Sequence, residues 1–139
     1  MRVMAIDFGS KRIGIATGNL ATGLAFPWGV IGRVDDDTDI SAIISQIEIQ
    51  EVEILVVGMP FSMNGKVGPQ ANATAQFIQL LSENSPVNIQ TWDERLTTVE
   101  ASRRLRESNA KNRYEGIEDA IAASIILQAF LDSERSLSL

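Results

Sequence analysis

Three acidic positions stand where apolar segments of the chain begin or end. Asp7 closes the first apolar run, and Asp119 opens the last. Between them, Asp93 and Glu94 follow the run that ends at Trp92. A carboxylate beside buried apolar groups costs desolvation free energy unless something compensates for it. If these sites converge, their oxygens suit Mg²⁺ or Mn²⁺, which predicts metal-assisted hydrolysis of phosphodiester bonds.

Each acid also has an ordinary structural interpretation. An Asp before Phe8 and Gly9 is typical of a turn, and an Asp in the first turn of a helix is favoured by the helix dipole. Asp119 alone is better explained in that way, so only the acids together indicate a metal site. Because Asp93 and Glu94 are adjacent, their side chains point in different directions, and at most one is expected to face the metals.

Composition limits the chemistry further. The chain has 139 residues, which fits one domain over 1–139, and it contains neither cysteine nor histidine. A disulfide framework, a zinc–thiolate site, a Cys nucleophile and a Ser-His-Asp triad are therefore excluded. No signal-peptide pattern or membrane-length apolar run is present, so we expect a cytoplasmic protein with no membrane partner.

The charge is acidic overall but unevenly distributed. A net charge of −6 argues against general affinity for nucleic acid. Half of the twelve basic residues nevertheless fall in one short stretch: Arg95, Arg103, Arg104, Arg106, Lys111 and Arg113. A basic rim for nucleic acid and a solvated helix face explain this stretch equally well.

The elements that must position the acids follow from apolar periodicity. Strands are predicted at 2–8, 13–18, 24–33, 54–57 and 87–92, and helices around 37–47, from 69, from 98 and at 117–132. The first three strands have short links, which indicates an antiparallel meander. The order βββαβαβαα predicts an α/β fold with a mixed sheet and helices on both faces.

Local signals refine the helices. The acids from Asp37 to Asp39 supply N-cap chemistry for the first helix, and Pro69 is placed as the first residue of the second. The buried stripe of that second helix is predicted at Ala73, Phe77, Leu80 and Leu81.

The last helix carries an acid and core residues on one stripe. Its members are Asp119, Ala122, Ala123, Ile126 and Phe130. The two alanines allow a strand to approach closely, which would place Asp119 near the end of that strand.

The long glycine-punctuated loop over 58–68 is a second candidate for function. It follows a buried strand and enters a helix N-terminus, where phosphate can be held. Lys66 is its candidate contact to a phosphate.

Four segments together resemble the YqgF/RuvX family, described both as pre-16S rRNA nucleases and as Holliday junction resolvases. They are Asp7 to Ala16, Gly58 to Gln70, Asp93 to Thr98 and Asp119 to Gln128, and they occur in the family order. The resemblance implies a ribonuclease H-like fold, a bacterial cytoplasmic setting and a role in maturing the 5′ end of 16S rRNA. Asn19 and Glu115 depart from the usual family pattern, which puts substrate affinity in question but leaves the acids intact.

The resemblance also assigns residues. Asp7, Glu94 and Asp119 become the catalytic acids, and these three with Asp93 become the candidate metal ligands. In a two-metal scheme Asp7 bridges two Mg²⁺ ions about 4 Å apart. Flanking phosphates are assigned to four basic residues: Lys11, Arg12, Lys66 and Arg95.

Several alternatives remain open from the sequence. The substrate is precursor rRNA or branched DNA, and the protein is a monomer or a homodimer. A non-catalytic nucleic-acid-binding module is a rival that the occupied acidic positions disfavour. A nucleotide-binding phosphotransferase is a weaker rival, because 139 residues leave no room for its second lobe.

Overall fold

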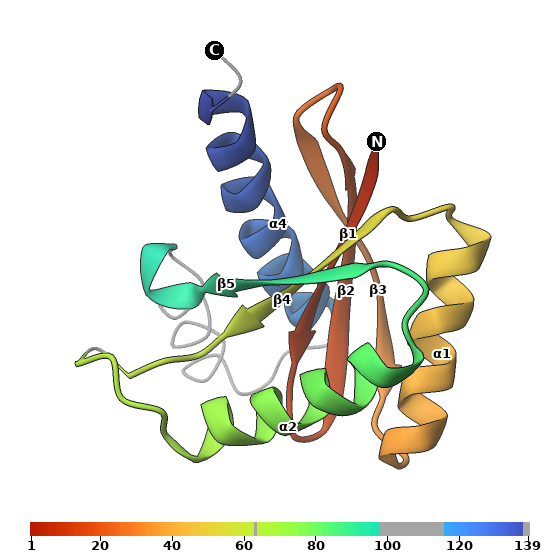
Figure 1. Cartoon of the computed structure of the whole chain (residues 1–139), viewed down its shortest axis with the longest axis vertical. Helices are drawn as coiled ribbons and strands as arrows, with labels where there is room; N and C mark the ends of the chain where they lie inside the picture. The colour runs from red at the N-terminus through yellow and green to blue at the C-terminus, as the bar shows by residue number, and fades with distance from the viewer. Residues whose placement is uncertain (63, 98–115, 138–139) are drawn as a thin grey trace.

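The computed structural model describes residues 1–62, 64–97 and 116–137. Five strands form one sheet in the order β3-β2-β1-β4-β5 (Figure 1). The first three are β1 (Arg2–Phe8), β2 (Arg12–Asn19) and β3 (Leu24–Gly32), and they form the predicted antiparallel meander. Strands β4 (Ile54–Met59) and β5 (Asn88–Asp93) add in parallel on the other side of β1.

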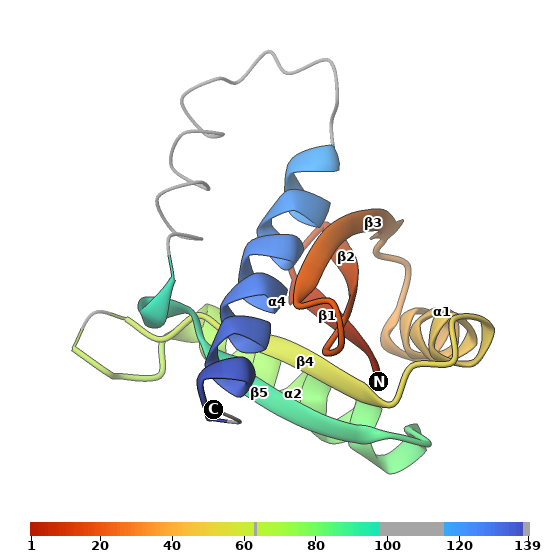
Figure 2. The same cartoon turned by 90° about the horizontal axis from the view of Figure 1, so that it is seen from above.

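Helices cover both faces of this sheet. α1 (Asp36–Ile49) and α2 (Pro69–Asn84) lie on one face, and α4 (Ile117–Leu137) crosses the other (Figure 2). A short 3₁₀ turn, η1 (Glu94–Leu96), follows β5 directly. The predicted mixed sheet with helices on both faces is confirmed, while the helix predicted from 98 lies outside the described residues.

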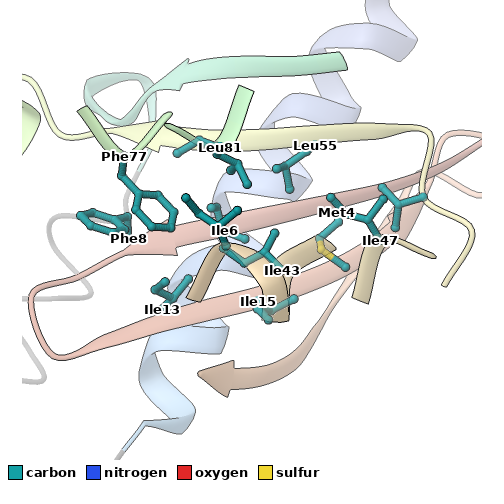
Figure 3. Close-up of a cluster of buried hydrophobic side chains, with 13 residues drawn as sticks. Met4, Ile6, Phe8, Ile13, Ile15, Ile43, Ile47, Leu55, Phe77 and Leu81 are labelled. Carbon is teal, nitrogen blue, oxygen red and sulfur yellow. The ribbon is translucent and has the colours of Figure 1, made fainter. Parts of the chain in front are cut away.

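The core is divided by the sheet into two unequal clusters. Large side chains fill the space under α1 and α2, including Ile6, Phe8 and Phe77 (Figure 3). Phe8 and Phe77 stack with ring centroids 4.3 Å apart. The cluster under α4 contains several alanines, such as Ala5, Ala16 and Ala122, so that the helix lies close to the strands.

A buried ion pair connects the large cluster to the turn after β1. The Arg33 guanidinium donates to the nearly inaccessible Asp39 carboxylate at 2.6 Å and lies 4.5 Å from the Phe8 ring centroid. It also donates to the Gly9 carbonyl at 3.3 Å. Because burial makes such a pair costly to break, it fixes the turn that follows Asp7.

Two helix details differ from the sequence-based expectation. The N-cap of α1 is Asp35, whose side chain accepts a hydrogen bond from the Thr38 amide, so assigning the cap to Asp37–Asp39 was wrong. That hydrogen bond lowers the pKa of Asp35. The last helix also continues five residues beyond the predicted end at 132.

The buried stripe of α2 was also predicted only in part. Phe77 and Leu81 face the core as expected, but Ala73 is exposed and Leu80 is 37% exposed. Thr74 takes an inward position instead, because its hydroxyl donates to the Gln70 carbonyl and is satisfied without water. Among the described helices, none is long and apolar enough to cross a lipid bilayer.

Candidate functional site

Strand alternation places Asp7 on the α4 face of the sheet. Val3 and Ala5 share its parity on β1 and lie in the cluster under α4, whereas Met4 and Ile6 face the opposite cluster. Side chains alternate along a strand, so Asp7 points toward α4. It is only 5% exposed, although it stands at the end of the strand.

Two glycines flank Asp7 on the neighbouring strands. Gly14 of β2 is its antiparallel partner. Gly58 of β4 follows Val57, which pairs with Ile6, and is therefore next to Asp7 on the other side. Neighbouring strands are about 4.8 Å apart, so each glycine lies roughly that far from Asp7. Because neither has a Cβ, other segments can approach the sheet closely on both sides of the carboxylate.

The other two predicted acids approach the sheet at these two glycines. A Cβ on Gly58 would lie 3.2 Å from both Cγ and Cδ of Glu94, whose side chain is 4% exposed. A Cβ on Gly14 would overlap the main-chain carbonyl of Asp119. The structure therefore brings Asp7, Glu94 and Asp119 over three neighbouring strands, although they are far apart in sequence.

Asp93 has a different environment from its neighbour. Its carboxylate accepts hydrogen bonds from the Arg95 guanidinium at 2.6 and 3.0 Å and from the Arg95 amide at 3.0 Å. The side-chain hydrogen bond from Arg95 is the main cause of a lowered pKa of Asp93. The geometry favours Glu94 over Asp93 as the acid that faces Asp7, and the metal roles of both stay predictions.

Asp119 is held by a basic residue from the meander. The Nε of Arg12 donates to Oδ2 of Asp119 at 2.7 Å, with side-chain exposures of 32% and 20%. In the part of the chain that the structure describes, no three acidic side chains are already gathered as ligands around one point. The convergence of Asp7, Glu94 and Asp119 on one region nevertheless fits an oxygen-ligated divalent cation, provided that the Asp119 side chain turns inward.

Basic side chains lie on both sides of the acids. Lys11, which is exposed, and Arg12 stand at the turn between β1 and β2. On the other side, Arg95 follows β5 with its guanidinium 5.6 Å from the Phe61 ring centroid, in contact range of the loop that carries the exposed Lys66. All four predicted phosphate-binding residues therefore lie at the end of the sheet that contains the C-terminal end of β1.

The glycines are the site residues that sequence reasoning missed. Gly14 lies inside the strand predicted at 13–18 and Gly58 begins the loop predicted over 58–68, and neither was assigned to the site. An isolated glycine inside a strand also signals close approach of another backbone or ligand, and this signal would have identified Gly14. For Gly58 the useful signal was its position one residue beyond a continuous buried run.

Of the two departures from the family pattern, only Asn19 can be placed. It pairs with Arg2 at the opposite end of β1 from Asp7, and its side chain accepts a hydrogen bond from the Ala21 amide. Asn19 is therefore a turn residue remote from the acids. Glu115 lies outside the described residues, as does the basic stretch from Arg103 to Arg113.

Comparison of the fold defines the class of protein. RuvC from T. thermophilus, solved with a Holliday junction substrate, superposes with a TM-score of 0.62 at 12% identity, covering 97% of this chain and 96% of that one. The fowlpox virus Holliday junction resolvase gives a TM-score of 0.57 at 14% identity, over 96% and 99% of the two chains. These similarities define a ribonuclease H-like fold.

Sequence comparison then identifies the family. Residues 1–133 match the model of RuvX, described as Holliday junction resolvase. A relative from Halothermothrix orenii is 40% identical over 138 residues, 99% of each chain, and one from a Roseiflexus species is 43% identical over 135 residues, 96% of each. Both bear the name "Putative pre-16S rRNA nuclease".

The chain belongs to the RuvX family. The resemblance drawn from the four sequence segments is thereby confirmed. Both descriptions are of enzymes that hydrolyse phosphodiester bonds, so the family is one of nucleases. Nucleases of this resolvase class generally use divalent metal ions and act on nucleic acid.

Proposed function

We propose that this chain is a metal-dependent endonuclease that processes the 5′ end of pre-16S rRNA during ribosome biogenesis. The observation that carries the proposal is the placement of Asp7, Glu94 and Asp119 over three neighbouring strands, in a fold shared with resolvases. The names of the relatives support rRNA as the substrate. We also propose that residues 1–139 act as a single nuclease domain in the cytoplasm.

The three acids would hold the metal, for which we propose Mg²⁺ or Mn²⁺. Asp7 lies between the other two and is suited to contribute to two ions, with Glu94 and Asp119 each completing one. When bound, such ions lower the pKa of an attacking water and stabilise the leaving oxygen. The two glycines beside Asp7 let the Asp119 main chain and the Glu94 side chain approach the sheet closely, which brings the three acids into one region.

The basic residues would position the substrate. Arg12 and Lys11 lie on one side of Asp7, and Lys66 and Arg95 on the other. A nucleic-acid backbone that crosses the sheet edge would meet positive charge before and after the acids, which fixes the register of the scissile phosphate. Their contribution to binding should weaken as salt rises.

The test is cleavage of an RNA that spans the 5′ end of 16S rRNA, in Mg²⁺, by the wild type and by Asp7→Asn. We expect the rate to fall by at least about 100-fold, since even residues that only support metal ligands cost about 10- to 100-fold when changed. Asp37→Asn is the matched control, because Asp37 is an exposed acid on α1, across the sheet. An Asp7→Asn protein that cuts at the wild-type rate would overturn the proposal.

A second candidate function is cleavage of four-way DNA junctions. The RuvX description and the fold shared with RuvC favour it. A junction offered in the same assay separates the two substrates, and symmetric cutting of both strands requires two active sites and hence a homodimer. Mass measurement in solution decides between monomer and homodimer. RNA binding without cleavage, unchanged by Asp7→Asn or Asp119→Asn, would instead show a binding module.

A further inference from the structure

We propose that Arg12 is a place-holding cation that keeps Asp119 neutralised until a divalent metal takes its place, and that its release links metal binding to nucleic-acid binding. The inference rests on the proposed function, because it concerns the same acidic site. It assigns Arg12 two partners in succession, a carboxylate and then a phosphate, in place of a phosphate alone.

The first observation is the ion pair itself. Arg12 Nε and Asp119 Oδ2 are 2.7 Å apart and come from positions separated by 107 residues. The same carboxylate is the one that must turn toward Asp7 to serve as a metal ligand. A guanidinium and a divalent ion on the same carboxylate would lie close together, and their positive charges repel, so the two cations compete for Asp119.

The second observation is that the pair is positioned to open without a change of fold. Both side chains are partly exposed, at 32% and 20%, and ion pairs in contact with solvent are weak. The Arg12 backbone is fixed, because its carbonyl accepts a hydrogen bond from the Gly9 amide at 2.9 Å. Asp119 is likewise fixed by its main chain over Gly14.

The third observation is where a released guanidinium would lie. The Arg12 stem passes the start of α4, with its Cδ 3.6 Å from the position of a Cβ on Gly116. Arg12 shares its face of β2 with Gly14 and is two residues away along the strand, or roughly 7 Å. A phosphate held above Asp7 is therefore within reach of the long Arg12 side chain.

Charge explains why the exchange would be coupled. Without metal, an Asp119 carboxylate turned toward Asp7 and Glu94 would be repelled by them, and its ion pair with Arg12 avoids that repulsion. A bound divalent ion supplies more positive charge than Arg12 and would repel it from Asp119. The guanidinium is then able to contact the anionic backbone of the substrate. Metal should therefore raise RNA affinity, and RNA should raise metal affinity by the same factor.

The experiment measures binding rather than turnover. Mn²⁺ is titrated calorimetrically into RNA-free wild type, Arg12→Gln and Arg12→Lys, and RNA affinity is measured with and without Ca²⁺. We expect Arg12→Gln to bind Mn²⁺ roughly fivefold more tightly, to bind RNA more weakly, and to lose most of the gain in RNA affinity that Ca²⁺ gives the wild type, a gain of about fivefold or more. Arg12→Lys keeps the positive charge, so its affinities for Mn²⁺ and RNA should lie between those of the wild type and Arg12→Gln.

Arg2→Gln is the matched control. It makes the same substitution near the opposite end of the β1–β2 pair, where Arg2 donates to the Gln50 carbonyl. It should leave Mn²⁺ affinity unchanged. The Arg12 side-chain Nε–H resonance, assigned by its absence in Arg12→Lys, should shift when metal is added and shift again with RNA. Thermal unfolding of each variant separates these effects from loss of fold.

The outcomes distinguish the inference from the proposed function. If the wild type binds Mn²⁺ and cuts RNA while Arg12→Gln binds Mn²⁺ no more tightly, the place-holding role is overturned and the nuclease stands. An unchanged Arg12 Nε–H resonance at saturating metal leads to the same conclusion. If the wild type binds no Mn²⁺, the place-holding role and the proposed metal-dependent nuclease function are both overturned.

Discussion

The two faces of the sheet are built from different kinds of residue. Under α1 and α2, the strands present large apolar side chains such as Ile6, and Phe8 stacks on Phe77. Under α4 the same strands present alanine, glycine and acid, with Asp7 between Gly14 and Gly58. One face buries much apolar area and stabilises the fold, while the small residues of the other face let α4 and Glu94 come close to the strands and bring the acids together.

This division explains how a buried carboxylate is tolerated. Asp7 follows Ile6 on β1, and their side chains point to opposite faces of the sheet. Packing of Ile6 in the large cluster therefore holds the strand in place directly beside the acid. The Arg33–Asp39 ion pair further holds the turn after Asp7 from the large-cluster side. Alternate residues of the same strand therefore serve stability on one face of the sheet and function on the other. Substitutions under α1 and α2 should mainly lower stability, whereas those under α4 should also lower the cleavage rate.

The largest effect on stability is expected on the large-cluster face. Phe77→Ala removes a fully packed ring that stacks on Phe8 and should lower the free energy of unfolding by about 3–5 kcal/mol. Denaturant unfolding measures this loss. Because Phe77 is on the far side of the sheet from the acids, the cleavage rate of the folded fraction should remain near that of the wild type. A selective loss of turnover would break the separation of the two faces.

A smaller but clear loss of stability is expected from Gly14→Ala. The added Cβ would meet the backbone carbonyl of Asp119, which cannot rotate away, so β2 and α4 must separate. We expect a loss of about 1–3 kcal/mol, together with reduced cleavage because Asp119 moves. Gly29→Ala is the control, since nothing lies within 4 Å of a Cβ there. Equal unfolding midpoints for the two variants would contradict the close approach.

Gly58→Ala should sharpen the comparison by affecting function more than stability. Its Cβ would lie 2.6 Å from Cδ1 of Ile126, a flexible side-chain end, and 3.2 Å from the Glu94 carboxyl carbon. We expect a loss of stability near 1 kcal/mol, at the low end for overpacking. Displacing Glu94 should lower the cleavage rate by roughly tenfold, as expected for residues that support metal ligands. Rate and unfolding are measured on the same preparation.

The smallest effect is expected from Asp93→Asn, at the edge of the site. Hydrogen bonding by Arg95 lowers the pKa of Asp93 below its usual value of 3.8. A lowered pKa in the folded state means that the pair adds stability above pH 3.8, and this contribution is lost as the pH falls through the lowered value. The difference in Tm between wild type and Asp93→Asn should therefore be largest near neutral pH and shrink in acid.

A double-mutant cycle with Arg95→Gln isolates the Asp93–Arg95 interaction itself. Because the pair is partly exposed, the coupling should be small and should fall with added salt. If the coupling is large and independent of salt, Asp93 belongs to the buried site together with Glu94.

Much of the fold was predictable because it depends on periodicity. Continuous apolar character at 3–6 and at 54–57 and helical spacing after Asp35 reflect burial, which each residue experiences locally. The errors fall where burial depended on a partner. Thr74 faces the core in place of the predicted Ala73, because a hydroxyl can bond to its own helix, which apolar counting ignores. The N-cap of α1 was assigned to the wrong residue because several neighbouring acids could serve equally well as a cap.

The sequence by itself determined which residues alternate, which segments are buried, and that Asp7 ends a buried strand in a chain without histidine or cysteine. Only the tertiary structure decided that Glu94 lies over Gly58 while Asp93 turns to Arg95, and that Arg12 meets Asp119 across 107 residues. The physical reason is that periodicity reports whether a side chain is buried, a property of its own segment. Which groups it meets depends on strand order, register and the close approach that glycines permit, and these are fixed only when distant segments pack together.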